Sequence, residues 1–187
     1  MKILLTGCCG FIGFNFVNSL VKTNKKIKII GIDNLNNYYS VGLKKARLKI
    51  LLKSKNFTFQ KMDLENLKLL NNLFKKNKFD CIFHLAAQAG VRYSIKNPKK
   101  YIDSNIIGFF NIIELAKKMN IKKIFYASSS SVYGDSKEFP LNEKTKINPK
   151  NIYGLTKKFN EELAEIYSNY YDINFIGLRF FTVYGEW

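Results

Sequence analysis

The chain has 187 residues, of which 47% are hydrophobic and 15% aromatic, so it carries enough apolar surface for one sizeable core. The net charge of +17 comes from 31 basic and 14 acidic residues spread along the chain without a nucleic-acid-binding motif, so we expect a solvated, lysine-rich surface and no nucleic-acid partner. The chain also lacks an apolar run of the roughly 18 residues that a membrane helix needs, a secretion signal, and cysteines spaced for disulfides or zinc, which predicts a cytoplasmic protein with no membrane contact and no metal site.

Short apolar runs alternate with segments of helical spacing along the whole chain. The predicted strands are Lys2–Leu5, Ile27–Ile32, Phe57–Lys61, Cys81–Leu85, Lys123–Ala127 and Asn174–Leu178. The predicted helices are Phe11–Lys22, Val41–Leu52, Leu64–Lys75, Pro98–Met119 and Pro149–Tyr171. This alternation predicts the α/β class, a doubly wound parallel sheet of six or more strands with helices on both faces, as in the Rossmann dinucleotide-binding fold.

A glycine-rich turn follows the first predicted strand and opens the first predicted helix. Gly7, Gly10 and Gly13 are spaced GxxGxxG, and Phe11 and Ile12 lie between the last two. Glycines let the chain turn sharply and let its backbone approach a pyrophosphate, while the helix N-terminus offers free N–H groups to the phosphates. In this strand–turn–helix context the motif predicts a dinucleotide site.

Two aspartates end the next predicted strands. Asp33 can accept hydrogen bonds from the adenosine ribose, and no arginine follows it directly, which favours NAD over NADP. The alternative for Asp33 is a solvent-facing turn residue. Asp63 could reach the adenine or could cap a helix beginning at Leu64.

A tyrosine and a lysine stand four residues apart in the last predicted helix. Tyr153 and Lys157 therefore lie on one helix face, where a cation would favour the phenolate and lower the pKa of the phenol. Such a pair can act as an acid–base catalyst on a hydroxyl. Serines 128–131 follow the fifth strand and could bind the same oxygen, although a serine run is also typical of a turn. The only histidine, His84, ends an apolar strand and is interpreted as structural.

Six stretches of the chain resemble the extended short-chain dehydrogenases of the NAD-dependent epimerase/dehydratase family, and within it the UDP-glucuronate 4-epimerases. These stretches are TGCCGFIGF, DNLNNYY, HLAAQAGVRYSIKNP, YASSSSVYG, YGLTKKFNEELAEIYS and LRFFTVYG. They run from the first residues to the last, so the resemblance covers the whole chain. It implies a fold with bound NAD and a reversible oxidation at C4 of a UDP-sugar.

The resemblance also implies roles for individual residues. The catalytic group would be Ser129, Tyr153 and Lys157, with Ser128 or Ser130 as alternatives for the serine. Residues implied to contact the substrate are Ser129, Thr182 and Arg92, although Arg92 could equally be a surface residue. The full set expected to contact NAD is Gly7, Gly10, Phe11, Ile12, Gly13, Asp33, Asn34, Asp63, Leu64, Leu85, Ala86, Ala87, Gln88, Asn105, Tyr153, Lys157 and Phe180.

The chain departs from the family pattern at its end. Family members continue after the TVYG segment with a proline, a tryptophan and an arginine that holds the sugar carboxylate, whereas here Glu186 replaces the proline and Trp187 is the last residue. We therefore expect residues 1–187 to be the NAD-binding domain with its YxxxK pair, with the substrate-binding domain largely absent.

Several functions remain open at this point. The leading one is a nucleotide-sugar 4-epimerase of the UDP-glucuronate/UDP-galacturonate type. The alternatives are another NAD-dependent sugar-nucleotide epimerase, a 4,6-dehydratase, or an NAD-binding fragment without activity. A dehydratase ranks lower because Ser130 and Ser131 stand where its family members carry an Asp-Glu pair. The resemblance also implies a homodimer formed through the two long helices, with Phe109, Ile113, Phe159 and Ile166 as candidate contacts.

Overall fold

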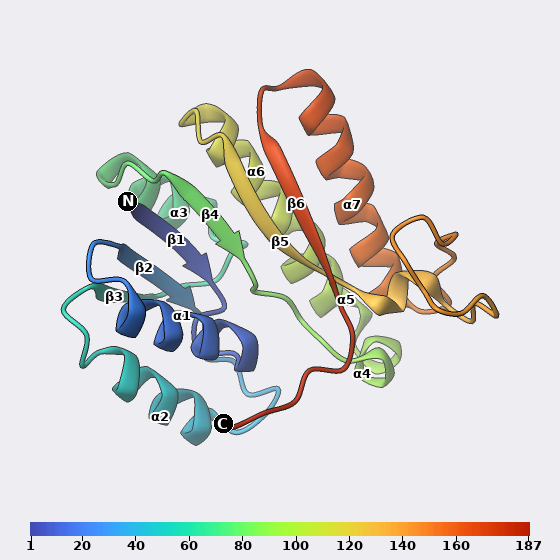
Figure 1. The fold of residues 1–187 in the computed structure, drawn as a ribbon, viewed down its shortest axis with the longest axis horizontal. Coiled ribbons are helices and arrows are strands. Elements are labelled where there is room, and N and C mark those ends of the chain that lie inside the picture. The colour runs from blue at the N-terminus through green and yellow to red at the C-terminus, as the bar shows by residue number, and fades with distance from the viewer.

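A computed structural model describes all residues from 1 to 187. Its core is one sheet of six parallel strands in the order β3-β2-β1-β4-β5-β6 (Figure 1). The strands are β1 (Lys2–Thr6), β2 (Lys28–Asp33), β3 (Phe57–Lys61), β4 (Cys81–His84), β5 (Lys123–Ser129) and β6 (Asn174–Phe180). The predicted doubly wound α/β fold is confirmed. The strand order reverses between β1 and β4, where ligands bind in folds of this class.

Helices cover both faces of the sheet. The main helices are α1 (Phe11–Thr23), α2 (Val41–Leu51), α3 (Leu67–Lys76), α6 (Gly108–Lys118) and α7 (Ile152–Tyr170). In Figure 1, α1 and α2 lie on one side of the sheet, and α3, α6 and α7 lie on the other. None of the helices combines the length and the apolar composition needed to cross a bilayer.

Alternate residues of the central strand supply two separate cores. Ile3 and Leu5 are fully buried against α1, in a cluster that includes Phe14. Leu4 points to the other face and joins a larger cluster with Ile112 of α6. Side chains of a strand alternate between faces, so a strand covered on both sides is apolar at every position. This explains the unbroken KILLT run of β1.

The helix predicted over Pro98–Met119 is one continuous helical run with a π-helical segment inside it. It consists of α5 (Pro98–Tyr101), the π-turn η1 (Ile102–Ile107) and α6. At the junction, a Cβ on Gly108 would come within 2.8 Å of Leu64 Cβ, so α6 packs closely on the loop after β3. Asn105 lies within this π-helical segment, and its side chain bonds to the backbone of Gln88 in the loop after β4.

Two helices begin later than predicted because an asparagine caps each one. The α7 helix begins at Ile152, not Pro149, since the Asn151 side chain accepts a hydrogen bond from Gly154 N at 2.8 Å. The α3 helix begins at Leu67, where Asn66 plays the same part. Two short elements have no counterpart in the sequence predictions, namely α4 (Val91–Lys96) and the 3-10 turn η2 (Ser130–Tyr133).

The last residues cross the carboxyl ends of the strands toward α1 (the red segment in Figure 1). The Trp187 ring lies 5.6 Å from that of Phe14, and Asn15 Nδ2 donates to the Glu186 carbonyl at 3.3 Å. The segment after β6 thus runs along the same sheet edge as the glycine turn, with Phe181 and Val183 at the rim of a cavity.

Candidate active site

A cavity of about 580 Å³ opens at the carboxyl ends of the strands. The sequence-predicted residues that line it are Gly7, Gly10, Phe11, Ile12, Gly13, Asp33, Asn34, Asp63, Leu64, Leu85, Ala86, Ala87, Gln88, Ser129, Tyr153, Lys157 and Phe180. The structure therefore brings together segments from every part of the chain, and the cofactor and catalytic candidates share one cavity.

Three of the proposed residues do not line this cavity. Asn105 is buried behind its wall, where it accepts from Gln88 N at 2.7 Å and donates to the Gln88 carbonyl at 3.1 Å and to Thr156 Oγ1 at 3.0 Å. It can therefore act on a cofactor only by holding Gln88. Arg92 on α4 and Thr182 after β6 are both exposed.

The glycine turn is built from backbone that tolerates no side chain. Gly7 has a φ of 74°, and a Cβ there would lie 2.8 Å from Ala86 Cα. A Cβ on Gly13 would lie only 2.1 Å from the Gly7 carbonyl oxygen. No side chain caps α1 at Gly10, so the first N–H groups of the helix are available to an anion.

The acidic end of the site is held by hydrogen bonds. Asp33 accepts from Cys9 N at 3.0 Å and from Leu35 N at 2.8 Å, which fixes its carboxylate beside the turn. Asn34 donates to Asp63 Oδ1 at 2.7 Å. Asp63 is therefore engaged as an acceptor at the cavity wall, and Asn66, rather than Asp63, provides the cap of α3.

Two buried cations near Asp33 escaped the analysis of the sequence. Lys44 is 4% exposed and donates to the carbonyl and side-chain oxygens of Asn36, and burial lowers the pKa of its ammonium. Arg47 is 2% exposed and donates to the Cys9 carbonyl at 3.3 Å and to Tyr39 OH at 2.9 Å, but its Nε has no partner. Both line the cavity. The lysine-rich composition of α2 masked them, because buried and solvated lysines look alike in a sequence.

The catalytic candidates converge at the other end of the cavity. Lys157 is 1% exposed, and its Nζ donates to the Ala127 carbonyl at 2.8 Å. Burial lowers the pKa of this ammonium to about 8. The same Nζ lies 5.9 Å from the centre of the Tyr153 ring. At neutral pH the ammonium therefore remains mostly charged, although its burial is costly.

The Tyr153 phenol behaves differently from the expectation. Burial raises its pKa above the ordinary value, and a hydrogen bond with Ser129 counteracts this effect only in part. We expected the Lys157 ammonium to lower the pKa of the Tyr153 phenol. This effect is absent here because the ammonium is bonded to a carbonyl and lies away from the phenol. The Tyr153 side chain is thus a protonated acid here.

Among the candidate serines, the geometry favours Ser129. Ser128 donates its hydroxyl proton to Glu161, so this proton is not available to a ligand. Ser130 does not line the cavity. Ser129 lines the cavity, and its Oγ accepts from Ser131 N at 3.2 Å, which leaves its proton available to a ligand or to Tyr153.

His84 is a core residue, as its sequence position indicated. It is 2% exposed, its Nδ1 lies 3.1 Å from Thr6 Oγ1, and its ring meets the edge of Phe109. Burial, with Lys157 nearby, lowers the pKa of His84 to about 3. The imidazole is therefore neutral at physiological pH and lies outside the cavity.

Comparisons with known proteins point in one direction. The model of the NAD dependent epimerase/dehydratase family matches residues 3–187. Protein CapI of Staphylococcus aureus is 50% identical, over all of this chain and 55% of the relative. UDP-glucuronate 4-epimerase 4 of Arabidopsis thaliana is 44% identical, over all of this chain and 43% of the relative.

Solved structures agree with the sequence matches. A UDP-glucuronic acid 4-epimerase from Bacillus cereus, crystallised with UDP-glucuronic acid and NAD, superimposes with a TM-score of 0.91 at 35% identity. That match covers 99% of this chain and 58% of the Bacillus chain. The chain thus spans about half the length of the relatives it matches.

Proposed function

Because the chain belongs to the NAD-dependent epimerase/dehydratase family, we propose that it provides the cofactor-binding and acid–base residues of a 4-epimerase of the UDP-glucuronate type. The observation that carries the proposal is the meeting of Ser129, Tyr153 and Lys157 with the glycine turn in one cavity. An acid–base group beside a dinucleotide site is the arrangement that reversible oxidation of a hydroxyl requires. The choice of sugar is supported by the names of relatives, among them the plant and Bacillus enzymes.

The cavity fits NAD, the cofactor of the family. The tight turn forms only because Gly7 and Gly13 carry no Cβ, which would clash with the Ala86 backbone and the Gly7 carbonyl, and this turn places the N-terminus of α1 at the cavity. Asp33, oriented by two backbone N–H groups, presents acceptors suited to ribose hydroxyls. When bound, NAD supplies the group that takes up and returns the hydrogen at C4 of the sugar.

Residues of the chain would transfer the proton of the C4 hydroxyl. In the proposal, Tyr153 exchanges a proton with the C4 hydroxyl, and Ser129 holds the same oxygen by a hydrogen bond. Lys157, one turn along α7, is the cation placed to favour the ionised form of Tyr153 once its bond to the Ala127 carbonyl is given up.

The proposed substrate contacts come from the resemblance to the family. By resemblance, Thr182 touches the sugar carboxylate and Arg92 a phosphate or carboxylate, and both are exposed where a ligand could reach them. A 4,6-dehydratase is less well supported, because Ser130 and Ser131 offer neither the added acid nor the added base of that reaction.

The test combines binding and turnover. We expect these 187 residues to bind NAD in calorimetry. We expect little interconversion of UDP-glucuronate and UDP-galacturonate, since the matched relatives carry roughly as much chain again, and remote contacts help to reach the transition state. Chromatography of the sugar nucleotides after incubation measures turnover, with Tyr153→Phe as the matched control. Turnover that survives in Tyr153→Phe would refute the assigned base, and failure to bind NAD would refute the proposal as a whole.

A homodimer through the long helices is part of the proposal, with revised contacts. Phe109 and Ile113 cannot contribute, because both are fully buried against the sheet. On α7, Phe159 and Ile166 are 38% and 52% exposed, and Leu155, four residues before Phe159, is 57% exposed. These α7 residues form an apolar stripe that a second copy could cover. Sedimentation that shows only monomer at tens of micromolar (on the order of assay concentrations) would contradict it.

A further inference from the structure

The helix α7 is tied to the end of β5 at two successive residues. Lys157 Nζ donates to the Ala127 carbonyl, and one turn further along, Glu161 accepts the hydroxyl proton of Ser128. Residues four apart share a helix face, so both contacts come from the side of α7 that faces the strand. Ser129 follows directly in the chain. Its position relative to the helix is therefore set by the two residues before it.

A single arginine holds the Glu161 carboxylate in place. Arg179 of β6 donates from Nε to Glu161 Oε1 at 2.9 Å and from Nη2 to Oε2 at 2.8 Å. Its strand position pairs with Ser128 in the register of β5 and β6, so Arg179 and Ser128 reach Glu161 from neighbouring strands. The side chains of Arg179 and Glu161 are only 21% and 14% exposed. A bidentate pair of this kind fixes direction as well as distance.

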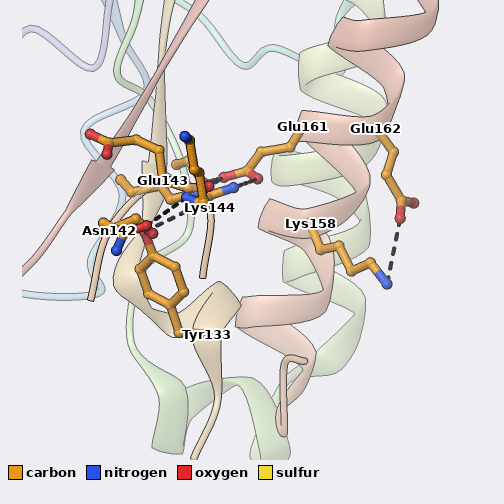
Figure 2. Close-up of polar contacts among 9 residues, drawn as sticks. Tyr133, Asn142, Glu143, Lys144, Lys158, Glu161 and Glu162 are labelled. Carbon is orange, nitrogen blue, oxygen red and sulfur yellow. Dashed lines mark hydrogen bonds and ion pairs between the residues drawn. The ribbon is translucent and has the colours of Figure 1, made fainter. Parts of the chain in front are cut away.

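The same guanidinium also holds the segment after Ser129. Arg179 Nη1 donates to Tyr133 OH at 3.1 Å and to the Glu143 carbonyl at 3.2 Å. Tyr133 in turn donates to the Asn142 carbonyl at 2.9 Å. Figure 2 shows Tyr133, Asn142 and Glu143 gathered on the inner side of α7, toward which Glu161 points. Ser129 therefore lies between two anchored points, Ser128 before it and η2 after it.

We propose that Arg179 and Glu161 are positioning residues that hold Ser129, which lines the same cavity as Tyr153, where its hydroxyl can hydrogen-bond to the Tyr153 phenol. Neither residue lines the cavity, so they act through Ser128 and Tyr133 and not on a ligand. Tyr153 lies on α7 as well, two turns before Glu161. The helix that carries the phenol is therefore joined to the end of β5 through Glu161 and Ser128, and Arg179 of β6 holds Glu161 in place. The functional meaning of this contact rests on the proposed function, but the contact itself can be tested without substrate.

A neighbouring ion pair on α7 provides a matched control. Lys158 and Glu162 lie on the same helix at 3.5 Å, with side chains 33% and 57% exposed. In Figure 2 this pair lies on the outer side of α7, away from the cluster around Tyr133. It links two positions of one helix and reaches no other element, so its loss should leave the Ser129–Tyr153 geometry unchanged.

The experiment follows the titration of Tyr153 in the cofactor-free protein. Incorporated 3-fluorotyrosine acidifies every phenol and reports each by ¹⁹F NMR, and the Tyr153 signal is identified by its loss in Tyr153→Phe. Three variants are compared with wild type, namely Arg179→Met, Glu161→Gln and the control Glu162→Gln. Calorimetry with NAD checks that the cofactor end of the cavity is intact.

Positioning and simple electrostatics predict opposite patterns. Removing the Arg179 charge by itself would raise the pKa of Tyr153, and removing the Glu161 charge by itself would lower it. If both residues act by holding Ser129 against the phenol, both variants lose that hydrogen bond and both raise the Tyr153 midpoint, by about 0.5–1 pH unit. NAD affinity should change less than about threefold, and Glu162→Gln should match wild type.

Two results would overturn the proposal. One is a shift in opposite directions for Arg179→Met and Glu161→Gln, which would mean a field effect alone. The other is an unchanged Tyr153 midpoint in both folded variants. If Arg179→Met does not fold, Arg179→Lys keeps the charge but loses the bidentate fork, and it must still raise the midpoint. Loss of NAD binding in wild type would instead refute the proposed function.

Discussion

At the glycine turn the cavity wall is backbone, whereas at the catalytic end it is side chain. Gly7 and Gly13 shape the first region through contacts within one turn and with the loop after β4, at Ala86. In the second region, Ser128, the residue before Ser129, bonds to a glutamate on α7, which an arginine on β6 holds in turn. The first is specified by a local motif and the second by the register of two strands. We therefore expect one added methyl group in the turn to weaken cofactor binding greatly. At the catalytic end, we expect substitutions to weaken the alignment of Ser129 with Tyr153 by degrees.

The largest effect should come from Gly13→Ala. The new Cβ would lie 2.1 Å from the Gly7 carbonyl oxygen, so the turn must open and the path for a pyrophosphate is lost. We expect NAD affinity to fall by about 100-fold or more, equivalent to about 3 kcal/mol, as measured by calorimetry. The control is Gly42→Ala in α2, whose Cβ would meet only Ser40 Oγ at 3.5 Å. It should bind NAD normally and gain up to about 1 kcal/mol of stability.

Substitution of Asp33 should have the next largest effect. Asp33→Ala removes the acceptor expected to bind the ribose, and it frees Cys9 N and Leu35 N. We expect NAD to bind about 10–100-fold more weakly, as for the loss of hydrogen bonds to a charged group. NADP should lose far less, because Lys44 and Arg47 remain beside the vacated position.

Titration calorimetry of wild type and Asp33→Ala with both cofactors measures this difference. Asp33→Asn keeps the size and one acceptor oxygen, and it should fall between the two. An equal loss for NAD and NADP would show that the carboxylate holds the turn together without selecting the cofactor.

A third substitution changes stability and not cofactor binding, and it measures the free-energy cost of burying Lys157. The pKa of buried Lys157 is lowered from 10.5 to about 8, so folding at neutral pH must bury a charge. Below about pH 8 this cost is present in full, and between about 8 and 10.5 the unfolded chain binds more protons, so stability should rise with pH. Lys157→Met should therefore be more stable than wild type at pH 7, by about 1–3 kcal/mol, and should lose this pH dependence.

Urea denaturation across that pH range measures the effect. Lys158→Met is the matched control on the outer side of α7, where the side chain is 33% exposed. It should change stability by no more than about 0.5 kcal/mol at any pH. A Lys157→Met protein that is less stable than wild type at pH 7 would mean that the bond to the Ala127 carbonyl outweighs the cost of burial.

Much of the fold was predictable because its signals are local. Every predicted strand is present, with ends shifted by at most two residues, since apolar strands buried on both faces stand out from the helices between them. The helix ends were less predictable. Asn151 and Asn66 cap helices inside the predicted spans, and the π-helical segment Ile102–Ile107 interrupts the single helix predicted over Pro98–Met119.

The amino-acid pattern was enough to predict the α/β class, the glycine turn and the pairing of Tyr153 with Lys157, because each signal comes from residues that are close together in the chain or from the regular alternation of local patterns. The three-dimensional fold was needed to show that Lys44 and Arg47 are buried beside Asp33, and that Arg179 joins Glu161 to the residues around Ser129. Contacts of this kind depend on which strands are neighbours and in what register. Those are properties of the assembled sheet, and no short stretch of sequence encodes them.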